Sequence, residues 1–451
     1  MGRLFGTDGV RGVANTELTA ELAYKLGRYG AIVLAGETNH KPKIIVGSDT
    51  RISCPMLECA LVSGICSAGA DALVCGVIPT PGIAKLVREY DCDAGVVISA
   101  SHNSYEFNGI KFFSSEGYKL PDRIEDEIEA LINDPSVWAD RFPTGAEIGH
   151  RLFCETASSD YSDSLKKAFS IDLTGLKIAL DCANGATSYI APGLFTELGA
   201  QVFTTGASPD GININKNCGS THPENLSKLV VDNKCDIGLA FDGDGDRMLA
   251  VDEDGVVVDG DVIMAIMADH MKQLGELKND TLVVTVMSNL GLDIFAAANG
   301  ITLAKTKVGD RYVLEEMAAH GHSIGGEQSG HIILLDNATT GDGMLSALKL
   351  LQVICDTSSS IKRLKGIMHV LPQVLKGVRV TNDNKEKVMN DPDLASKYKE
   401  IESELSGRGR VLVRASGTEP LIRVMLEGED IDKITELCDS IITMISLKYS
   451  V

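Results

Sequence analysis

Short apolar runs alternate with helical patterns along most of the chain. Runs at 43–46, 72–77 and 95–99 end in polar or glycine-bearing turns. Between them, apolar residues at helical spacing within 22–33 fall on one face of a helix. Apolar runs that alternate with helices are typical of parallel or mixed α/β sheets. The pattern therefore predicts a repeated strand, turn and helix.

This rhythm occupies three successive parts of the chain. It restarts at 177–180, continues to 237–241, and restarts again at 282–286 after a helix that begins near Asp261. We therefore predict three α/β domains with mixed sheets, over residues 1–152, 153–256 and 257–368.

The last part of the chain has a different pattern. Residues 382–406 are highly charged with a helical pattern, 410–413 and 421–426 read as two strands around a turn, and 431–449 form an amphipathic helix. This pattern predicts a smaller C-terminal α+β domain over residues 369–451.

Composition and charge narrow the class of partner. The chain has 451 residues and a net charge of −21. Such a charge argues against a nucleic-acid backbone or an anionic membrane surface as partner. No apolar run approaches the roughly 18 residues of a membrane span. A site for an anionic small molecule would have to gather basic residues locally.

The cysteines bear on the cellular compartment. The eleven cysteines are scattered, odd in number and without a CxxC pair. This usage is typical of reduced thiols. The N-terminal residues lack the apolar core of a signal peptide. We therefore expect a cytoplasmic protein.

An acidic loop is the strongest single chemical signal. Asp242, Asp244 and Asp246 follow the strand-like run 237–241 and are separated by glycines. Alternating carboxylates on a loop that glycine allows to curl form a hard-oxygen cation site. Mg²⁺ suits phosphate chemistry because it completes its shell with phosphate oxygens.

A calcium-binding helix–loop–helix is the alternative for this loop. The three aspartates fit loop positions one, three and five, and Glu253 falls at position twelve. However, Arg247 stands where that loop needs glycine, and the flanks at 237–241 and 248–251 resemble strands. The pattern favours magnesium over calcium.

A serine supplies the partner for this loop. Ser101 lies in a polar turn, with His102 and Asn103, directly after the run 95–99. A serine hydroxyl can carry a phosphoryl group between two steps of a reaction. Alone, the segment is more typical of an ordinary turn. Together with the acidic loop it predicts metal-assisted phosphoryl transfer through a serine.

Two further segments suit a phosphorylated sugar. Residues 414–420, followed by Arg423, combine backbone N–H groups, hydroxyls and guanidinium groups that suit a phosphate dianion, with a hairpin turn as the alternative. The glycine-rich turn 325–331 offers donors and acceptors for sugar hydroxyls. Its His331 is a candidate for proton transfer, although a lone histidine is usually structural.

Basic residues are also present near the N-terminus. The loop 6–12 presents Arg11 but lacks the GK[ST] ending of a Walker loop. Lys111 follows the turn signal Asn108-Gly109, and on a strand its side chain would oppose its two apolar neighbours. The local cations that an anion site requires are Arg11, Lys111, Arg247, Arg414 and Arg423.

Several of these motifs together resemble a known superfamily. The segments 6–12, 99–103, 242–247, 326–331 and 414–423, in this order, are similar to the α-D-phosphohexomutases. Within that superfamily, four segments resemble most the bacterial phosphoglucosamine mutases in their residues: 5–12, 308–313, 326–331 and 414–425. Phosphomannomutase/phosphoglucomutase relatives usually carry another residue in place of Gln328.

The resemblance implies an architecture and a mechanism. It implies four domains around a central cleft, a phosphorylated Ser101, and Mg²⁺ held by Ser101, Asp242, Asp244 and Asp246. Arg247 and Lys111 would stabilise the transferring group, and His102 and Asn103 would support the serine loop. By similarity, Arg11, Lys111 and His331 would take part in proton transfer or stabilise the reacting oxygen.

The resemblance also implies a substrate. Glucosamine 6-phosphate and glucosamine 1-phosphate would interconvert through glucosamine 1,6-bisphosphate, in the synthesis of UDP-N-acetylglucosamine for peptidoglycan. The distal phosphate would be held by Arg414, Ser416, Gly417, Thr418 and Arg423, and the sugar by Val308, Gly309, Glu327 and Ser329. The assembly state stays open, a homodimer being one candidate.

Three alternatives to this activity follow from the same residues. The first is a phosphomannomutase or phosphoglucomutase, since no residue indicates directly that the sugar substrate carries a 2-amino group. The second is a non-catalytic calcium-binding protein, which leaves Ser101, Arg414 and Arg423 without a role. The third is a sugar phosphatase, which would more typically form its phosphoester on an aspartate.

Overall fold

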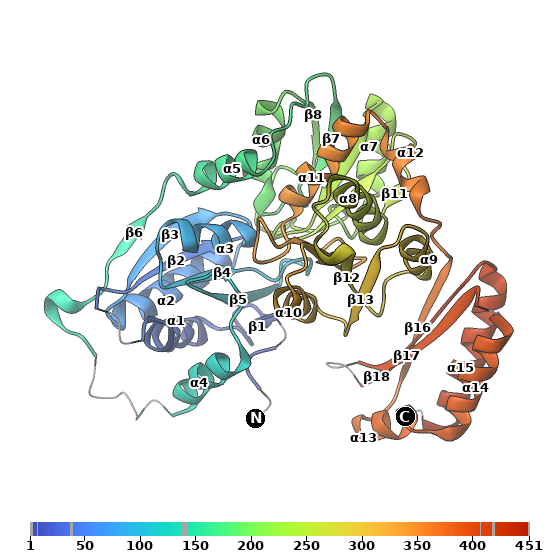
Figure 1. Cartoon of the computed structure of the whole chain (residues 1–451). Helices are drawn as coiled ribbons and strands as arrows, with labels where there is room; N and C mark the ends of the chain where they lie inside the picture. The colour runs from blue at the N-terminus through green and yellow to red at the C-terminus, as the bar shows by residue number, and fades with distance from the viewer. Residues whose placement is uncertain are drawn as a thin grey trace. The chain divides into compact units, whose positions relative to one another are not determined.

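Two compact units make up the chain. The computed structural model describes residues 3–6, 8–36, 39–134, 136, 142–405, 407–416 and 420–449. One unit comprises Met1–Met287 and Gly300–Ile367, and the other Ser288–Asn299 and Met368–Val451. Figure 1 gives the order of their helices and strands.

The first unit begins with a six-stranded mixed sheet of order β1-β5-β4-β2-β3-β6. Strands β2, β3, β4 and β6 pair in parallel, while β5 runs antiparallel to β1 and β4. The strands are β1 Val10–Val13, β2 Lys43–Ser48, β3 Asp71–Val77, β4 Ala94–Ile98, β5 Phe107–Ser114 and β6 Arg151–Phe153. The helices are α1 Ala20–Ala35, α2 Cys54–Ser67, α3 Thr80–Glu89, α4 Asp122–Asn133 and α5 Ala157–Ala168.

A second sheet follows, of order β11-β10-β9-β7-β8. Strands β7, β8 and β9 are parallel, and β9, β10 and β11 form antiparallel pairs. The elements are β7 Lys177–Asp181, α6 Ala191–Glu197, β8 Gln201–Thr205, α7 Glu224–Asn233, β9 Ile237–Phe241, β10 Met248–Val251 and β11 Val257–Val258. The mixed character expected of the sheets is confirmed.

The third sheet of this unit has the order β13-β12-β14-β15. Its elements are α8 Gly260–Leu274, β12 Thr281–Thr285, β13 Thr302–Thr306, α10 Asp310–His320, β14 Ile324–Gly326, β15 Ile332–Leu334, α11 Gly343–Thr357 and α12 Ile361–Leu364. Helix α8 begins where the Asp259 side chain accepts the N–H of Val262, and ends at Gly275 in the left-handed conformation.

The second unit is an antiparallel sheet of order β16-β18-β17 with helices. Its elements are α9 Leu290–Ala298, β16 Gln373–Arg379, α13 Asn382–Met389, α14 Pro392–Leu405, β17 Gly409–Ala415, β18 Leu421–Gly428 and α15 Ile431–Tyr449. The smaller α+β fold expected near the C-terminus is confirmed. Its core contains Val380, Leu394, Ile401, Val424 and Ile441, all buried.

A buried carboxylate ties α9 into this second unit. Glu427 on β18 is fully buried, and its Oε2 accepts the N–H of Leu290 at 3.0 Å. The same oxygen accepts from Arg410 Nε at 2.6 Å. A buried carboxylate needs such partners, because burial of an unpaired charge is costly. These contacts explain why Ser288–Asn299 belongs to the second unit.

The four-part division predicted from the sequence stays a prediction. Its boundary at 152 falls inside β6, and its boundary at 256 separates β10 from its antiparallel partner β11.

Three polar loops occupy equivalent places in the three sheets of the first unit. Ser101 follows β4, Asp242 follows β9, and Glu327 follows β14. Each of these strands pairs in parallel with a neighbour. Ligands of α/β sheets bind beyond the carboxyl ends of the strands, so the fold places all three loops where a site forms.

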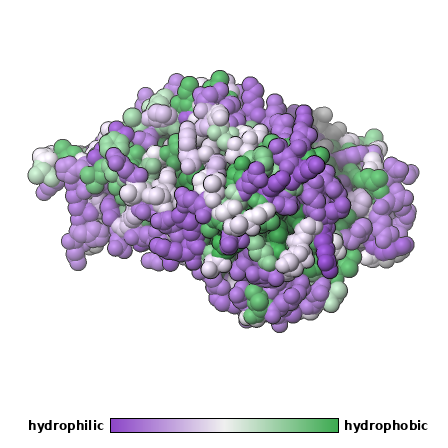
Figure 2. Space-filling view, turned by 90° about the horizontal axis from the view of Figure 1, so that it is seen from above, coloured by the Kyte–Doolittle hydropathy of each residue, from purple (hydrophilic) through white to green (hydrophobic). Residues whose placement is uncertain are grey.

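The surface is mainly polar. Hydrophilic residues cover most of the face seen in Figure 2, with hydrophobic residues scattered among them. This distribution agrees with the net charge of −21. Among the residues that the structure describes, no helix combines the length and the apolar character needed to cross a bilayer.

A buried acid caps α11. Asp342 accepts the N–H of Leu345 at 3.0 Å and the hydroxyl of Tyr161 at 2.8 Å. Both side chains are buried. Burial raises the pKa of Asp342 from 3.8 to about 6, although the two hydrogen bonds oppose the shift. The carboxylate is therefore less favourable in the folded protein than in the unfolded chain.

This shift predicts how Asp342→Asn changes stability with pH. A carboxyl whose folded pKa is raised stabilises the fold below the unfolded pKa, and that contribution is lost as pH rises through about 6. The loss amounts to about 3 kcal/mol at ~1.4 kcal/mol per unit. The amide keeps the cap and does not ionise. The Tm of Asp342→Asn relative to the wild type should therefore rise between pH 4 and pH 7.

The control for this experiment is Asp232→Asn, at an exposed residue of α7. Its Tm difference from the wild type should stay constant over the same range. A constant difference for Asp342→Asn as well would contradict the assignment of a buried, titrating cap.

Candidate active site

The hydroxyl of Ser101 meets the acidic loop. Its Oγ donates to Asp242 Oδ2 at 2.5 Å, across 141 positions of sequence. Ser101 is 2% exposed and has a φ of +51°, a left-handed conformation that few residues other than glycine adopt. Such strain persists only where surrounding contacts hold it, and it concentrates at functional sites. The two motifs that the sequence paired are therefore brought together.

The acidic loop brings three carboxylates to one point. Asp242, Asp244 and Asp246 are buried, and one oxygen of each lies within 4.8 Å of the others. Burial, followed by repulsion from Asp246 and Asp244, raises the pKa of Asp242 well above its ordinary value. A cation at this point would relieve the repulsion and favour the charged form of all three carboxylates.

Two oxygens of the loop are ready for such a cation. Asp244 Oδ1 and Asp246 Oδ1 are buried and accept no hydrogen bond from any residue that the structure describes. A buried carboxylate oxygen without a donor is costly, and a divalent cation would satisfy both. The set of three carboxylates and one hydroxyl fits Mg²⁺.

Glycines let the loop approach its neighbours. A Cβ at Gly243 would lie 2.5 Å from the Ser101 carbonyl oxygen. Gly245 has a φ of +72°, which favours glycine. These positions explain why the loop alternates aspartate with glycine.

The flanks of the loop exclude the calcium-binding alternative. A helix–loop–helix site needs helices on both sides, but β9 precedes the loop and β10 follows it as its antiparallel partner. Glu253, the expected twelfth ligand, lies beyond β10 and accepts the N–H of Lys362 at 3.2 Å. The strands predicted on both sides of the loop are confirmed.

Lys111 reaches the acidic loop from β5. It is 2% exposed, and its Nζ lies 2.8 Å from Asp244 Oδ2 and 3.0 Å from Asp8 Oδ2. Its neighbours Ile110 and Phe112 are in the hydrophobic core, as strand alternation predicts. Burial alone would lower the pKa of Lys111, but Asp244 and Asp8 outweigh burial and raise it. Lys111 is therefore a fixed positive charge.

Asp8 is the centre of a charge cluster that the sequence did not reveal. It pairs with Lys111, with Lys119 at 2.7 Å and, through a short contact, with Arg11. Lys119 also forms an ion pair with Asp310, with Nζ 2.5 Å from Oδ2. Although burial opposes the shift, these cations hold the pKa of Asp8 well below its ordinary value. Asp8 and Asp310 fall within quoted motifs, whereas no signal in the sequence marked Lys119.

His331 joins this cluster from the other side. It is buried, with Nδ1 3.5 Å from Asp246 Oδ2 and Nε2 3.6 Å from Asp310 Oδ2. The N–H of Gly341 donates to Nε2 at 3.1 Å, so the hydrogen of the neutral ring lies on Nδ1 and faces Asp246.

Arg11 and Arg247, the predicted arginines of the first unit, each have a side-chain N–H without a hydrogen-bond acceptor among the described residues. Arg247 donates its backbone N–H to Asp242 at 3.2 Å. Its side-chain Nε and that of Arg11 are buried and find no acceptor among the described residues. Buried guanidinium N–H groups without an acceptor fit an anionic ligand.

His102 is a neutral residue beside Ser101. Burial, with Arg247 and Arg11 adding to it, lowers the pKa of His102 to about 4. Its Nδ1 is buried and has no hydrogen-bond partner among the residues that the structure describes. A neutral ring at this place adds no charge to the serine loop.

Residues predicted to bind the sugar also come together. Glu327 follows β14, and its Oε1 accepts the N–H of Gly309 at 3.1 Å. Ser329 is exposed, and Val308 is partly exposed. The turn is closed by the N–H of Glu327, which donates to the carbonyl of His331 at 3.0 Å. Glu327 thus links the 308–309 loop to the turn before His331.

The predicted phosphate-binding residues lie in the second unit. Arg414 on β17 and Arg423 on β18 are directly opposite each other, and Ser416 follows β17. The Ser416 carbonyl accepts from Lys385 Nζ at 2.8 Å. Gly417 and Thr418 lie outside the described residues.

Arg51 holds the serine loop, and sequence reasoning missed it. It is 1% exposed and follows β2. Its guanidinium donates to the carbonyls of Ser101 and Asn103, both at 2.9 Å, and of Phe107 at 3.1 Å, with a short contact to Ser104. One rigid fork therefore holds four carbonyls of the loop.

Two more residues complete this support. Asp49 Oδ2 accepts from Arg51 Nε at 2.8 Å and from the Ser99 hydroxyl at 2.6 Å. Asn215 donates to the carbonyls of Ser101 at 2.8 Å and Asn103 at 3.0 Å. Asp49 and Arg51 stand just past a strand end, and that position was the available signal.

Comparison with known families agrees with this geometry. Phosphoglucomutase/phosphomannomutase alpha/beta/alpha domains I, II and III match residues 2–136, 159–255 and 259–371, and the C-terminal domain of the same family matches 351–444.

Individual relatives cover almost the whole chain. A phosphoglucosamine mutase of Acetivibrio thermocellus is 58% identical over 434 residues, 96% of each chain. A phosphoglucomutase/phosphomannomutase family protein of Burkholderia thailandensis superposes with a TM-score of 0.81 at 24% identity, over 99% of this chain and 97% of that one. The N-acetylphosphoglucosamine mutase of Aspergillus fumigatus, solved with GlcNAc-6P and magnesium, gives 0.70 at 18%, over 98% and 95%. The two structures show the shared fold.

The acidic loop should bind one divalent cation per chain. Replacement of Asp246 by asparagine keeps the shape and removes one ligand charge, so Asp246→Asn should weaken Mn²⁺ binding by about tenfold or more. Equilibrium dialysis with Mn²⁺, followed by EPR of the free ion, measures both affinity and stoichiometry.

A second cluster supplies the control. Glu316, His320 and His322 also place potential ligand atoms within 4.8 Å of one another. His320→Ala/His322→Ala should leave Mn²⁺ binding unchanged. Mn²⁺ affinity that survives in Asp246→Asn and is lost in the histidine variant would place the cation outside the acidic loop.

Proposed function

This chain belongs to the phosphoglucomutase/phosphomannomutase family of phosphohexomutases, and we propose that it interconverts glucosamine 6-phosphate and glucosamine 1-phosphate. The reaction type rests on one observation, the 2.5 Å contact that joins the Ser101 hydroxyl to the carboxylate loop. The substrate rests on likeness along the whole chain to relatives named phosphoglucosamine mutase. A phosphomannomutase or phosphoglucomutase is the alternative within the family.

Phosphorylated Ser101 is the proposed phosphoryl donor. The bond between phosphorus and Ser101 Oγ breaks, and a bond forms from phosphorus to a free hydroxyl of the sugar phosphate, which gives glucosamine 1,6-bisphosphate. The sugar hydroxyl loses its proton in this step, and Ser101 Oγ gains one to become a free hydroxyl. The second step reverses this transfer with the other phosphate, after the bisphosphate has turned over. Bound Mg²⁺ would neutralise charge on the transferring phosphoryl group.

Cations of the first unit are proposed to stabilise the negative charge on the transferring phosphoryl group. Lys111 keeps its proton because Asp244 and Asp8 raise its pKa above the ordinary value despite its burial. It therefore stabilises developing negative charge and does not act as a base. The buried Nε groups of Arg11 and Arg247 offer further donors to the phosphoryl oxygens.

Proton transfer by His331 would require a change in its hydrogen bonds. Its Nε2 already accepts the Gly341 N–H at 3.1 Å, and its Nδ1 faces Asp246. To take a proton from the sugar hydroxyl, the ring must give up the Gly341 contact. In the geometry described, His331 positions Asp246 and the loop at Gly341.

Binding of the sugar and of the distal phosphate is proposed for two groups of residues. Arg414 and Arg423 are cross-strand partners, so their side chains lie on the same face of the sheet, where two guanidinium groups can bind one phosphate dianion. The distal phosphate therefore suits Arg414, Ser416 and Arg423, with Gly417 and Thr418 proposed from the sequence alone. The sugar hydroxyls suit Val308, Gly309, Glu327 and Ser329.

The cellular role follows from this substrate. Glucosamine 1-phosphate feeds the synthesis of UDP-N-acetylglucosamine, the precursor of peptidoglycan. The free thiols of all eleven cysteines fit a cytoplasmic location. Assembly as a homodimer stays a prediction.

Phosphorylation of Ser101 is the direct test. Incubation with glucosamine 1,6-bisphosphate and Mg²⁺ should add one phosphate, located at Ser101 by intact mass and peptide mapping, and glucosamine 6-phosphate should remove it. Ser101→Ala should take up no phosphate and should lose activity by several orders of magnitude.

The matched control is Ser104→Ala, at an exposed serine of the same loop, which should keep both phosphate and activity. Activity that survives in Ser101→Ala would overturn the phosphoserine mechanism. Comparison of kcat/KM for glucosamine 6-phosphate, glucose 6-phosphate and mannose 6-phosphate decides between the proposed substrate and the alternative within the family.

Arg51 is proposed as a positioning residue, and Arg51→Lys tests it. Lysine keeps the positive charge beside Asp49 but cannot span the loop carbonyls. Since misplacement by about 1 Å can cost about 100-fold in rate, kcat should fall by about that factor. KM should change little, because Arg51 contacts none of the groups proposed to bind substrate. A purely structural role would lower Tm and leave kcat per folded molecule unchanged, which thermal unfolding and active-site titration would reveal.

A further inference from the structure

The start of α3 contacts the acidic loop at two points. Thr80, the first residue of α3, donates its hydroxyl to Asp244 Oδ2 at 2.7 Å and its backbone N–H to the Asp244 carbonyl at 2.9 Å. The two residues are 164 positions apart in the sequence, and each is 1% exposed. One buried residue outside the loop therefore holds both the backbone and the side chain of Asp244.

The two carboxylate oxygens of Asp244 have different surroundings. Oδ2 accepts a hydrogen bond from the Thr80 hydroxyl at 2.7 Å and another from Lys111 Nζ at 2.8 Å. Oδ1 is buried and accepts no hydrogen bond from any residue that the structure describes. A carboxylate oxygen offers about two lone pairs, so both lone pairs of Oδ2 are engaged. Oδ1 is therefore the oxygen of Asp244 that is left for a cation.

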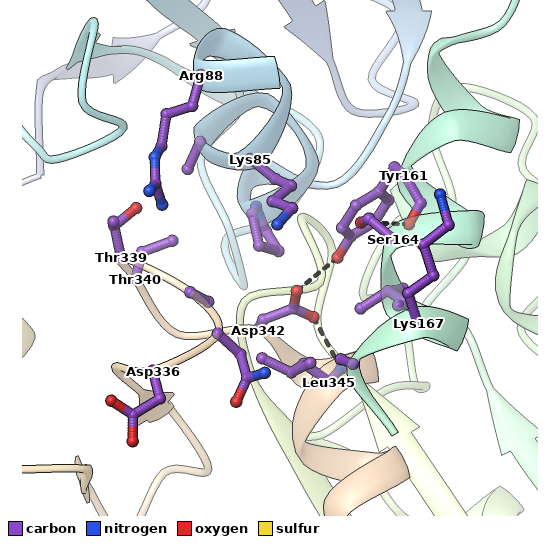
Figure 3. A pocket seen from close by; sticks show the side chains of 16 residues that line it. Lys85, Arg88, Tyr161, Ser164, Lys167, Asp336, Thr339, Thr340, Asp342 and Leu345 are labelled. Carbon is purple, nitrogen blue, oxygen red and sulfur yellow. Dashed lines mark hydrogen bonds between the residues drawn. The ribbon is translucent and has the colours of Figure 1, made fainter. Parts of the chain in front are cut away.

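The hydroxyl of Thr80 is shielded from water. A cavity of about 220 Å³ lies beside α3 and is lined by Pro81 and Lys85, among other residues (Figure 3). Thr80 is not among the residues that line this cavity. Because Thr80 is enclosed in this way, loss of its hydroxyl would leave Lys111 as the remaining donor to Asp244 Oδ2 among the described residues.

The engagement of Oδ2 limits Asp244 to one ligand atom. Ca²⁺ takes about six to eight oxygen ligands and often binds both oxygens of a carboxylate, whereas Mg²⁺ requires octahedral geometry and few protein ligands. For Asp244 to bind a cation through both oxygens, the Thr80 and Lys111 hydrogen bonds to Oδ2 would have to be given up. An aspartate that presents Oδ1 alone therefore suits the smaller ion.

We propose that Thr80 is a positioning residue that determines metal specificity: its hydroxyl holds Asp244 so that Oδ1 alone faces the cation, which favours Mg²⁺ over Ca²⁺. This inference rests on the proposed role of the acidic loop in binding a cation. It adds a residue of α3 to the determinants of that site.

Thr80→Val and Thr80→Ser test this role. Valine keeps the shape of threonine without the hydroxyl, whereas serine keeps the hydroxyl. Loss of a hydrogen-bond partner of a metal ligand typically costs about 10- to 100-fold in metal affinity, so Thr80→Val should weaken Mn²⁺ binding by about tenfold in equilibrium dialysis, and Thr80→Ser should stay within about threefold of the wild type. Equal losses in the two variants would implicate packing and overturn the proposal.

The matched control is Thr281→Val. Thr281 is 5% exposed, begins β12, and donates its hydroxyl to the Asn279 carbonyl at 2.8 Å. The control loses the same hydroxyl at another buried position, so its Mn²⁺ affinity should equal that of the wild type. A loss in Thr281→Val as large as that in Thr80→Val would make the effect a general consequence of a lost buried hydroxyl and would overturn the proposal.

Competition between cations gives a measurement that a change in stability alone would not alter. Mg²⁺ and Ca²⁺ displace bound Mn²⁺, and EPR of the free Mn²⁺ reports the affinity of each competitor. Thr80→Val should lose more affinity for Mg²⁺ than for Ca²⁺, so the ratio of the two affinities should fall by about threefold or more, while Thr80→Ser keeps the wild-type ratio. An unchanged ratio in Thr80→Val would overturn the role in specificity.

The wild type separates this proposal from the one on which it rests. A wild-type protein that binds no Mn²⁺ would overturn the metal role of the acidic loop together with that of Thr80. A wild type that binds Mn²⁺ with the same affinity as Thr80→Val would overturn the role of Thr80 alone.

Discussion

The burial of three carboxylates in one short loop is the constraint on which the site depends. Asp242, Asp244 and Asp246 are within 4.8 Å of one another and away from water. Such a group is stable only if positive charge surrounds it. Lys111 supplies part of that charge from β5, and Arg247 supplies part from the loop itself. Two carboxylate oxygens of the loop accept no hydrogen bond from the described residues, so the loop and the lysine form an electrostatic unit that a divalent cation would complete.

The same constraint explains the layers of contacts around the loop. Asp8 compensates the cations that face the carboxylates, and Lys119 compensates Asp8 and Asp310 in turn. Charges of alternating sign thus extend from the first sheet to the start of α10. Arg51 has a different role, because its hydrogen bond to the Ser101 carbonyl supports the left-handed conformation of Ser101 beside the acidic loop. Phosphoryl transfer depends on positioning as well as on charge stabilisation, so such support fits the proposed role of Ser101.

Much of this arrangement could be predicted from the sequence, for local reasons. The α/β rhythm, the acidic loop between two strands and the burial of Lys111 opposite its apolar neighbours depend on spacing along a few residues. The serine and the acidic loop could be paired because each needs the other chemically. Arg51, Asn215 and Lys119 could not be found in this way, because their partners lie 50 to 191 positions away. The position of Arg51 just past a strand end marks it only as a candidate, and the roles of all three residues depend on tertiary contacts.

Electrostatic range decides how such an acidic chain can handle anionic substrates. At physiological ionic strength the Debye length is about 8 Å, so exposed carboxylates farther away are largely screened. Lys111 is buried and Arg247 is partly buried, and they lie 2.8 Å and 3.8 Å from carboxylate oxygens of the acidic loop, where screening is weaker than at the surface. In the proposed reaction, the local cations would therefore govern binding of a phosphorylated sugar, although the protein as a whole is negative. Retention of the proposed bisphosphate between two half-reactions would then depend on short-range contacts with individual side chains, because charges farther away are screened.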